Sequence, residues 1–109
     1  YERQLKRGML EMIVLKMISK APSYGYQLLS DMDGESEGLF KIKEGTLYPI
    51  LYRLEDDGMI TSQWSVPKDK EVSKKYYVIT PEGERTLGEL IDLWKRYEQA
   101  VSRVLEEQR

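Results

Sequence analysis

The sequence contains neither cysteine nor histidine among its 109 residues. Without cysteine there can be no disulfide, no thiol nucleophile and no thiolate zinc site. Without histidine the chain lacks the usual general base, the centre of catalytic triads and the commonest ligand of transition metals. These two absences exclude most enzyme mechanisms, so we expect no enzymatic activity, no metal and no cofactor.

Long apolar runs are also missing, and the start of the chain has no signal-peptide pattern. We therefore expect no membrane segment and a cytoplasmic location. The length suits one domain, and a charged fraction of 33% favours a helical, strongly solvated surface. The net charge of −2 is unusual for a nucleic-acid binder, but the charge is uneven, because residues 21–40 carry acids and no base while lysines cluster within residues 68–75.

Helical spacing of apolar residues predicts helices over residues 2–19, 24–32 and 44–57. The first has apolar residues on more than one face, so we expect one face in the domain core and another against a partner. We expect Ser23 to cap the second helix, which would bury Tyr26, Leu29 and Met32. Gly58 is expected to end the third helix in a left-handed conformation.

Strand-forming residues at 59–66 and 74–79 predict a hairpin with a charged tip. Thr80 followed by Pro81 is a strong start signal for a helix that runs nearly to the end of the chain. The apolar residues of this last helix alternate in spacing between three and four, as in a coiled-coil seam. We expect the seam, together with the helix over residues 2–19, to form a homodimer interface. The seam residues are Leu87, Leu90, Trp94, Tyr97, Val101 and Val104.

This order of elements indicates a mainly α fold with a small β-hairpin: a winged helix-turn-helix followed by a long C-terminal dimerisation helix. Residues 1–80 would form the DNA-binding domain and residues 81–109 the dimerisation helix. In such a module the third helix enters the major groove and the hairpin tip reaches phosphates or the minor groove. Periodicity alone leaves open that the tyrosines of the third helix are partly buried and that Arg53 pairs with Asp56 or Asp57. The candidate DNA-binding residues on these two elements are Thr46, Tyr48, Pro49, Arg53, Lys68, Lys70, Lys74 and Lys75.

Four motifs make the interpretation more specific. They are Tyr24-Gly25-Tyr26, Gly45-Thr46-Leu47-Tyr48-Pro49, Leu54-Glu55-x-x-Gly58-x-Ile60 and Lys75-Tyr76-Tyr77-x-x-Thr80-x-x-Gly83. Across nearly the whole chain they resemble the PadR family of transcriptional regulators, in its short subfamily with a single C-terminal helix. The resemblance implies a homodimer, a double-stranded DNA operator with dyad symmetry, and repression. It adds Tyr24, Tyr26 and Lys43 to the candidate DNA-binding residues. Two positions depart from the family pattern: Ser73 stands where an arginine is common, and Lys43 where many members have serine.

Trp94 lies midway along the seam. In multidrug-sensing short members of the family, a tryptophan at a similar place lines a hydrophobic pore between subunits and stacks on flat aromatic compounds. The resemblance therefore implies a planar hydrophobic or cationic small molecule as effector, which would release the repressor from its operator. The alternative is that Trp94 only fills the dimer seam. The implied effector-binding residues are Leu5, Met9, Met12, Ile91, Trp94, Tyr97 and Glu98.

Two other interpretations were weighed. Residues 33–44 have the spacing of a calcium-binding loop, but glutamates at its third and fifth places and Lys41 at its ninth argue against calcium. A dimeric winged-helix protein-interaction module without sequence-specific DNA binding is the main alternative function, with the acidic residues 21–40 as its docking face.

Overall fold

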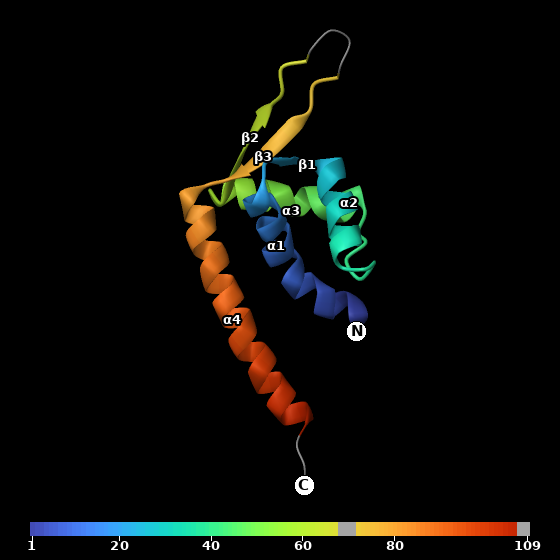
Figure 1. Ribbon diagram of the computed structural model, residues 1–109, viewed down its shortest axis with the longest axis vertical. Coiled ribbons are helices and arrows are strands. Elements are labelled where there is room, and N and C mark those ends of the chain that lie inside the picture. Colours follow the sequence, from blue (N-terminus) through green and yellow to red (C-terminus); the bar gives the residue numbers. More distant parts are fainter. Residues whose placement is uncertain (68–71, 107–109) are drawn as a thin grey trace.

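The computed structural model describes residues 1–67 and 72–106, which form four helices and three short strands (Figure 1). The chain is mainly helical, and the winged helix-turn-helix fold expected from the sequence is confirmed. In chain order the elements are α1 (Glu2–Lys20), β1 (Ser23–Tyr24), α2 (Gly25–Glu35), α3 (Glu44–Asp56), β2 (Ile60–Trp64), β3 (Lys75–Ile79) and α4 (Pro81–Leu105).

Helix α1 is the element around which the domain packs, since it contacts α2, α3, α4 and β3. Its apolar residues cover more than one face, as the sequence predicts, and half of them point into the core. The core is completed by apolar side chains from the other helices and from the wing strands. The buried core residues include Leu10, Val14, Leu15, Ile18, Leu28, Met32, Leu47, Leu51, Ile60 and Tyr77.

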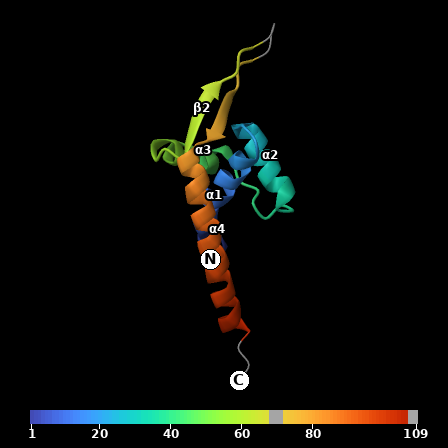
Figure 2. The same cartoon turned by 60° about the vertical axis from the view of Figure 1, so that its left-hand side comes forward.

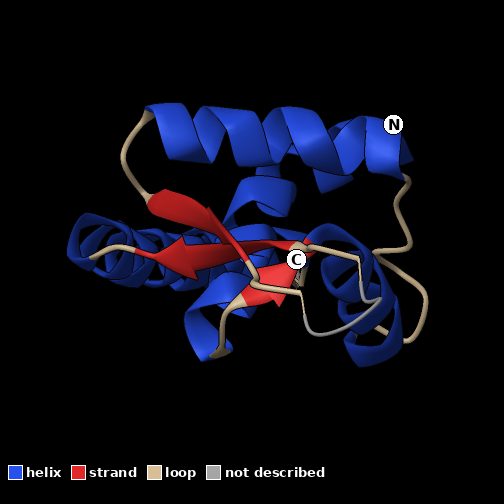
Figure 3. Ribbon diagram, turned by 90° about the horizontal axis from the view of Figure 1, so that it is seen from above, coloured by secondary structure: helices blue, strands red, loops and turns tan. Residues whose placement is uncertain are grey.

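The three strands form an antiparallel sheet in the order β1-β3-β2, and α1 runs along one side of it (Figure 3). Strands β2 and β3 form the wing, in a register that pairs Ile60 with Ile79 and Trp64 with Lys75. Strand β1 is only two residues long and pairs Ser23 with Tyr77. The sequence analysis missed β1, because a pair of residues has no periodicity.

The second helix differs from the prediction at both ends. It begins at Gly25 with Tyr24 as its N-cap, and Ser23 does not cap it. Ser23 is instead held in β1, where its hydroxyl donates to the Ala21 carbonyl at 2.9 Å. The prediction that Tyr26 is buried was also wrong: its side chain is 72% exposed, and Leu28 occupies the buried position.

The junction between α3, the wing and α4 is tightly bonded. Gly58 ends α3 with a φ of 77°, as the sequence predicts. Thr80 caps α4 by accepting the Gly83 N–H at 3.0 Å, and its own N–H donates to the Met59 carbonyl at 3.0 Å. A Cβ on Gly83 would lie 2.8 Å from Cγ1 of Ile79 and would overlap the Met59 carbonyl oxygen. The backbone of α4 therefore approaches the wing as closely as glycine allows.

Helix α4 is buried only at its start. Leu87, expected in the dimer seam, is instead buried in the core of its own chain, and Ile91 packs against that core. Beyond these turns α4 extends well past the other elements in both side views (Figures 1 and 2). Trp94, Tyr97 and Val101 are 40–63% exposed there. No helix of the described residues is long and apolar enough to cross a membrane.

The contact at Gly83 yields a prediction for stability. We expect Gly83→Ala to lower the free energy of unfolding by about 1–3 kcal/mol, because its methyl group meets backbone that cannot move aside. Gly88→Ala in the same helix is the matched control, since nothing lies within 4 Å of a Cβ there. This control should gain roughly 0.5–1 kcal/mol from helix propensity. Urea denaturation of both variants measures the difference, and equal stabilities would contradict the packing described for this junction.

Candidate nucleic-acid interface

One surface of the domain combines tyrosine rings with lysine side chains from β1, α2, α3 and the wing, around a shallow hollow of about 430 Å³. Tyrosine hydroxyls and lysine ammonium groups are donors with which proteins commonly contact DNA phosphates. Five of the expected DNA-binding residues meet here. We call it the tyrosine–lysine surface; its residues are Tyr24, Gly25, Tyr26, Tyr48, Tyr52, Trp64, Lys74, Lys75 and Tyr77.

The short strand β1 and the glycine after it shape this surface. Pairing of β1 with β3 brings the Tyr24 and Tyr76 rings edge to face, with 5.4 Å between centroids. Gly25 then leaves room for the Tyr48 ring of α3: a Cβ at this position would lie 2.9 Å from Cζ of Tyr48 and closer still to its hydroxyl. A larger residue at this position would have to displace the ring, so the glycine allows the half-buried Tyr48 to stand where it does.

The two lysines at the tip end of β3 lie over tyrosine rings. Nζ of Lys74 is 4.4 Å from the centroid of Tyr24, and Nζ of Lys75 is 5.5 Å from that of Tyr77. Both distances are in the range of cation–π attraction. Ser65 fixes the backbone of Lys74, since its N–H donates to the Lys74 carbonyl at 2.7 Å and its hydroxyl accepts the Lys74 N–H at 2.9 Å. The lysines are thus positioned on the surface by the wing itself.

Trp64 belongs to the same surface and was missed as a functional candidate. It is 65% exposed and stands opposite Lys75 in the hairpin. That pairing across the predicted hairpin is the signal that could have identified it. Lys68 and Lys70, the other expected phosphate ligands, lie outside the described residues.

Tyr77 forms the floor of the surface and is 1% exposed. Burial, and then the charges that Tyr48, Glu55 and Tyr52 carry when ionised, raise the pKa of Tyr77 from 10.0 to about 12. Its hydroxyl therefore stays neutral at any physiological pH. No negative charge develops at this position beneath the lysines.

The exposed side of α3 carries the remaining expected residues. Thr46, Pro49 and Arg53 are exposed, and Lys43 is exposed at the N-cap, where it makes no side-chain cap bond. Arg53 pairs with neither neighbouring aspartate: its Nη2 lies 3.2 Å from Oε2 of Glu11 on α1. Sequence analysis did not find this pair, because the two residues are far apart in the chain. Helix α3 is therefore linked to α1 by its one arginine.

A second groove of about 490 Å³ lies between α1 and α4. It brings together five of the expected effector-binding residues: Leu5, Met9, Met12, Trp94 and Tyr97. The other two, Ile91 and Glu98, do not line it. Glu11, which the sequence analysis did not consider here, is the one carboxylate of its lining. We call this the α1–α4 groove.

Among the described residues, no three acidic side chains gather closely enough to hold a metal ion. The ion pairs of this part of the chain lie on its surface. The chemistry of the tyrosine–lysine surface is therefore that of hydrogen-bond donors and fixed positive charge.

Comparison with known proteins agrees with this geometry. Residues 14–89 match the model of the transcriptional regulator PadR-like family. The uncharacterized protein X of Lysinibacillus sphaericus is 32% identical over 92% of this chain and 91% of its own length. A PadR family transcriptional regulator from Eggerthella lenta has a TM-score of 0.84 and 34% identity, over 96% of this chain and 88% of that one. A PadR-like transcriptional regulator from Bacillus cereus has a TM-score of 0.83 and 28% identity, over 96% and 99%.

The close approach at Gly25 can be tested separately from stability. In Gly25→Ala the added methyl group must displace the Tyr48 ring. We therefore expect the free energy of DNA binding to weaken by more than the free energy of unfolding. Gly34→Ala in the same helix is the control, because nothing lies within 4 Å of a Cβ there. DNA affinity by fluorescence anisotropy and melting by circular dichroism give the two readouts. If both variants bind DNA alike, Tyr48 does not depend on this glycine.

Proposed function

Because this chain belongs to the PadR-like family of transcriptional regulators, we propose that it is a dimeric repressor that binds a DNA operator with dyad symmetry. Family membership makes it a DNA-binding regulator of transcription. The observation that carries the finer proposal is the tyrosine–lysine surface, which lies beside the exposed side of α3. Recognition helix and phosphate-binding groups are thereby side by side, as docking into a major groove requires.

In this proposal the two kinds of residue have separate tasks. Thr46, Pro49 and Arg53 share one side of α3 and face base edges, which their hydroxyl, ring and guanidinium can read. Tyr48, about 200° from Thr46 around the helix, contacts an adjoining phosphate. Donors from the N-terminus of α2, the N-cap of α3 and the wing hold the phosphates on either side. These phosphate ligands are Tyr24, Tyr26, Lys43, Lys74 and Lys75, together with Lys68 and Lys70, which lie outside the described residues.

Arg53 must change partner to read a base. In the DNA-free chain it pairs with Glu11, and both side chains are about half exposed. An exposed ion pair contributes no more than about 1 kcal/mol, so DNA can compete for the guanidinium at little cost. Glu11 also lines the α1–α4 groove, which gives that groove a direct contact to the recognition helix.

The dimer is proposed to form through α4 and α1. Leu90, Trp94 and Tyr97 of the seam line the α1–α4 groove, and further along α4 Val101 and Val104 are 52% and 70% exposed. Apolar residues that repeat at seam spacing along an exposed helix face are typical of helix pairing. Two-fold pairing would bring both Trp94 side chains near the same axis.

We propose that the α1–α4 groove binds a planar aromatic cation. Methionine and aromatic side chains adapt to flat ligands, and Glu11 supplies the negative charge that favours a cation. A cation in the groove competes with Arg53 for this carboxylate. Ligand and operator then alter each other's affinity by the same factor.

DNA binding is tested by its salt dependence. Lys74→Gln and Lys75→Gln should each weaken operator and random DNA alike, because a phosphate contact carries no sequence information. Each should lower the slope of log affinity against log salt by about one unit per half-site, hence about two for the dimer. Lys95→Gln, exposed on α4, is the control. If the salt slope is unchanged in the variant that combines Lys74→Gln with Lys75→Gln, the proposed phosphate contacts are wrong. The protein-interaction module is then the better interpretation.

Dimer formation is tested by adding charge to the seam. Val101→Lys combined with Val104→Lys should yield a helical monomer at micromolar concentration, because neither residue is part of the chain's own core. Gln99→Lys adds a similar charge on the opposite side of α4 and should remain dimeric. Sedimentation velocity distinguishes monomer from dimer. A wild-type protein that is monomeric at micromolar concentration would contradict the proposed assembly.

The groove is tested by fluorescence with ethidium as the planar cation. The Trp64→Phe protein keeps only Trp94 as a tryptophan, and ethidium should quench it. The Trp94→Phe protein keeps only Trp64 and should show no saturable quenching. The reverse pattern would move the ligand from the groove to the tyrosine–lysine surface.

A further inference from the structure

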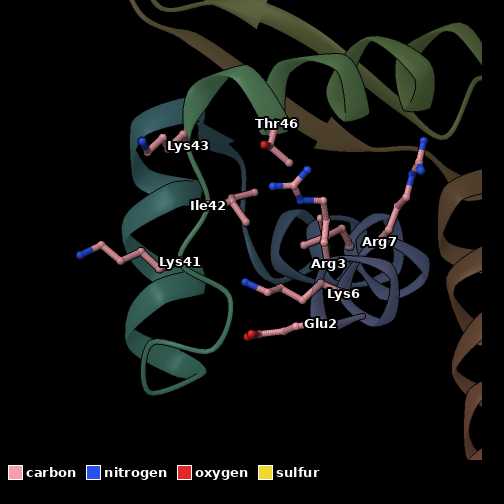
Figure 4. Close-up of a pocket in the computed structure, with 9 residues that line it drawn as sticks. Glu2, Arg3, Lys6, Arg7, Lys41, Ile42, Lys43 and Thr46 are labelled. Atoms are coloured by element: carbon pink, nitrogen blue, oxygen red, sulfur yellow. The ribbon is translucent and has the colours of Figure 1, made fainter.

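The largest of the hollows described here, of about 580 Å³, lies away from both surfaces discussed so far. It is bounded by the first turns of α1, the loop before α3 and the first turn of α3 (Figure 4). We call it the basic hollow. Its lining residues are Glu2, Arg3, Lys6, Arg7, Leu10, Lys41, Ile42, Lys43 and Thr46.

The lining carries five cationic side chains and one carboxylate, although the chain as a whole has a net charge of −2. The described part of the chain forms three ion pairs, and none of them uses any of these five cations. Like charges held together without a counter-charge repel one another, and this repulsion is relieved when an anion binds. The local excess of positive charge therefore favours an anionic ligand.

The cations have two different placements. Figure 4 shows Arg3 and Lys6 extending from α1 into the space below Thr46, whereas the Arg7 side chain extends upward and away from them. Lys41 and Lys43 extend outward from the loop, and the Glu2 carboxylate lies at the lower rim. The inner group can bind a ligand directly, whereas the two outer lysines attract anions to the opening.

The chemistry of the inner group favours phosphate. Guanidinium groups match phosphate oxygens with paired hydrogen bonds, and the Thr46 hydroxyl adds one donor. Leu10 and Ile42 provide an apolar wall. A phosphate ion alone has no apolar group that could contact this wall. The volume is within the range of sites for small molecules, roughly 300–1,000 Å³. We infer that the basic hollow binds a small phosphorylated molecule of nucleotide size, with its phosphates on Arg3 and Lys6.

A DNA backbone is the other polyanion that such charge could attract. The small molecule is favoured because the hollow is concave and has an apolar wall, neither of which a DNA phosphate chain needs. It also lies on the Thr46 side of α3, while Tyr48 follows about 200° further around the helix. Thr46 is exposed on the recognition helix, so a ligand that holds its hydroxyl removes one group from base readout.

Isothermal titration of the full chain, at low salt and without DNA, tests this inference with ADP and inorganic pyrophosphate as probes. ADP should bind more tightly than pyrophosphate because only ADP reaches the apolar wall. Arg3→Gln and Lys6→Gln should each weaken both probes, by about tenfold for a lost charge-assisted hydrogen bond. Lys16→Gln, an exposed lysine further along α1, removes the same charge outside the hollow and should leave binding unchanged.

Three results would overturn the inference. One is the absence of binding by either probe at millimolar concentration. Another is an equal loss of affinity in Lys16→Gln, which would mean non-specific attraction. The third is a reduced salt slope for DNA in the hollow variants without binding of either probe, which would assign the hollow to the DNA backbone. Because the titrations contain no DNA, their outcome is independent of the proposed operator binding.

Discussion

The carbonyl oxygen of Met59 is the point at which the functional elements of this protein are joined. It accepts the Thr80 N–H at 3.0 Å and lies against Gly83, where only a glycine allows the contact. The Thr80 hydroxyl lies 2.7 Å from the Gly58 carbonyl oxygen and also accepts the Gly83 N–H. Helix α3 ends just before this junction, both wing strands meet in it, and α4 begins in it. The direction of α4 is therefore fixed relative to α3.

The proposed function depends on this rigid junction. If α4 pairs with its copy, the angle of pairing decides how far apart the two recognition helices stand, and half-sites on DNA are separated by whole helical turns. A second connection runs through α1, because Glu11 contacts Arg53 of α3 and also lines the α1–α4 groove. A ligand in the α1–α4 groove can therefore act on α3 in two ways. It can change the direction of α4, and it can compete for the Glu11 carboxylate that pairs with Arg53.

The sequence predicted those features that local signals determine. Gly58, the Thr80-Pro81 start and the two strands of the hairpin are each decided by neighbouring residues, and all three are confirmed. Features made by residues far apart were not predicted: the pairing of Ser23 with Tyr77, the Glu11–Arg53 ion pair and the basic hollow. Tyr26 and Leu87 were misplaced for a related reason. A helix period tells which residues share a face, but the neighbours in space decide whether that face is core or surface.

The central claim is that the junction at Met59 holds the two recognition helices of a dimer at one distance. Because the chain has no cysteine, Asp57→Cys provides a single spin label per chain at the end of α3. Pulsed electron resonance should give one narrow distance distribution between the two labels. Adding Thr80→Ala removes the hydroxyl that bonds both sides of the junction, and it should broaden this distribution while sedimentation still shows a dimer. Equal widths with and without the threonine would show that the junction does not set the spacing.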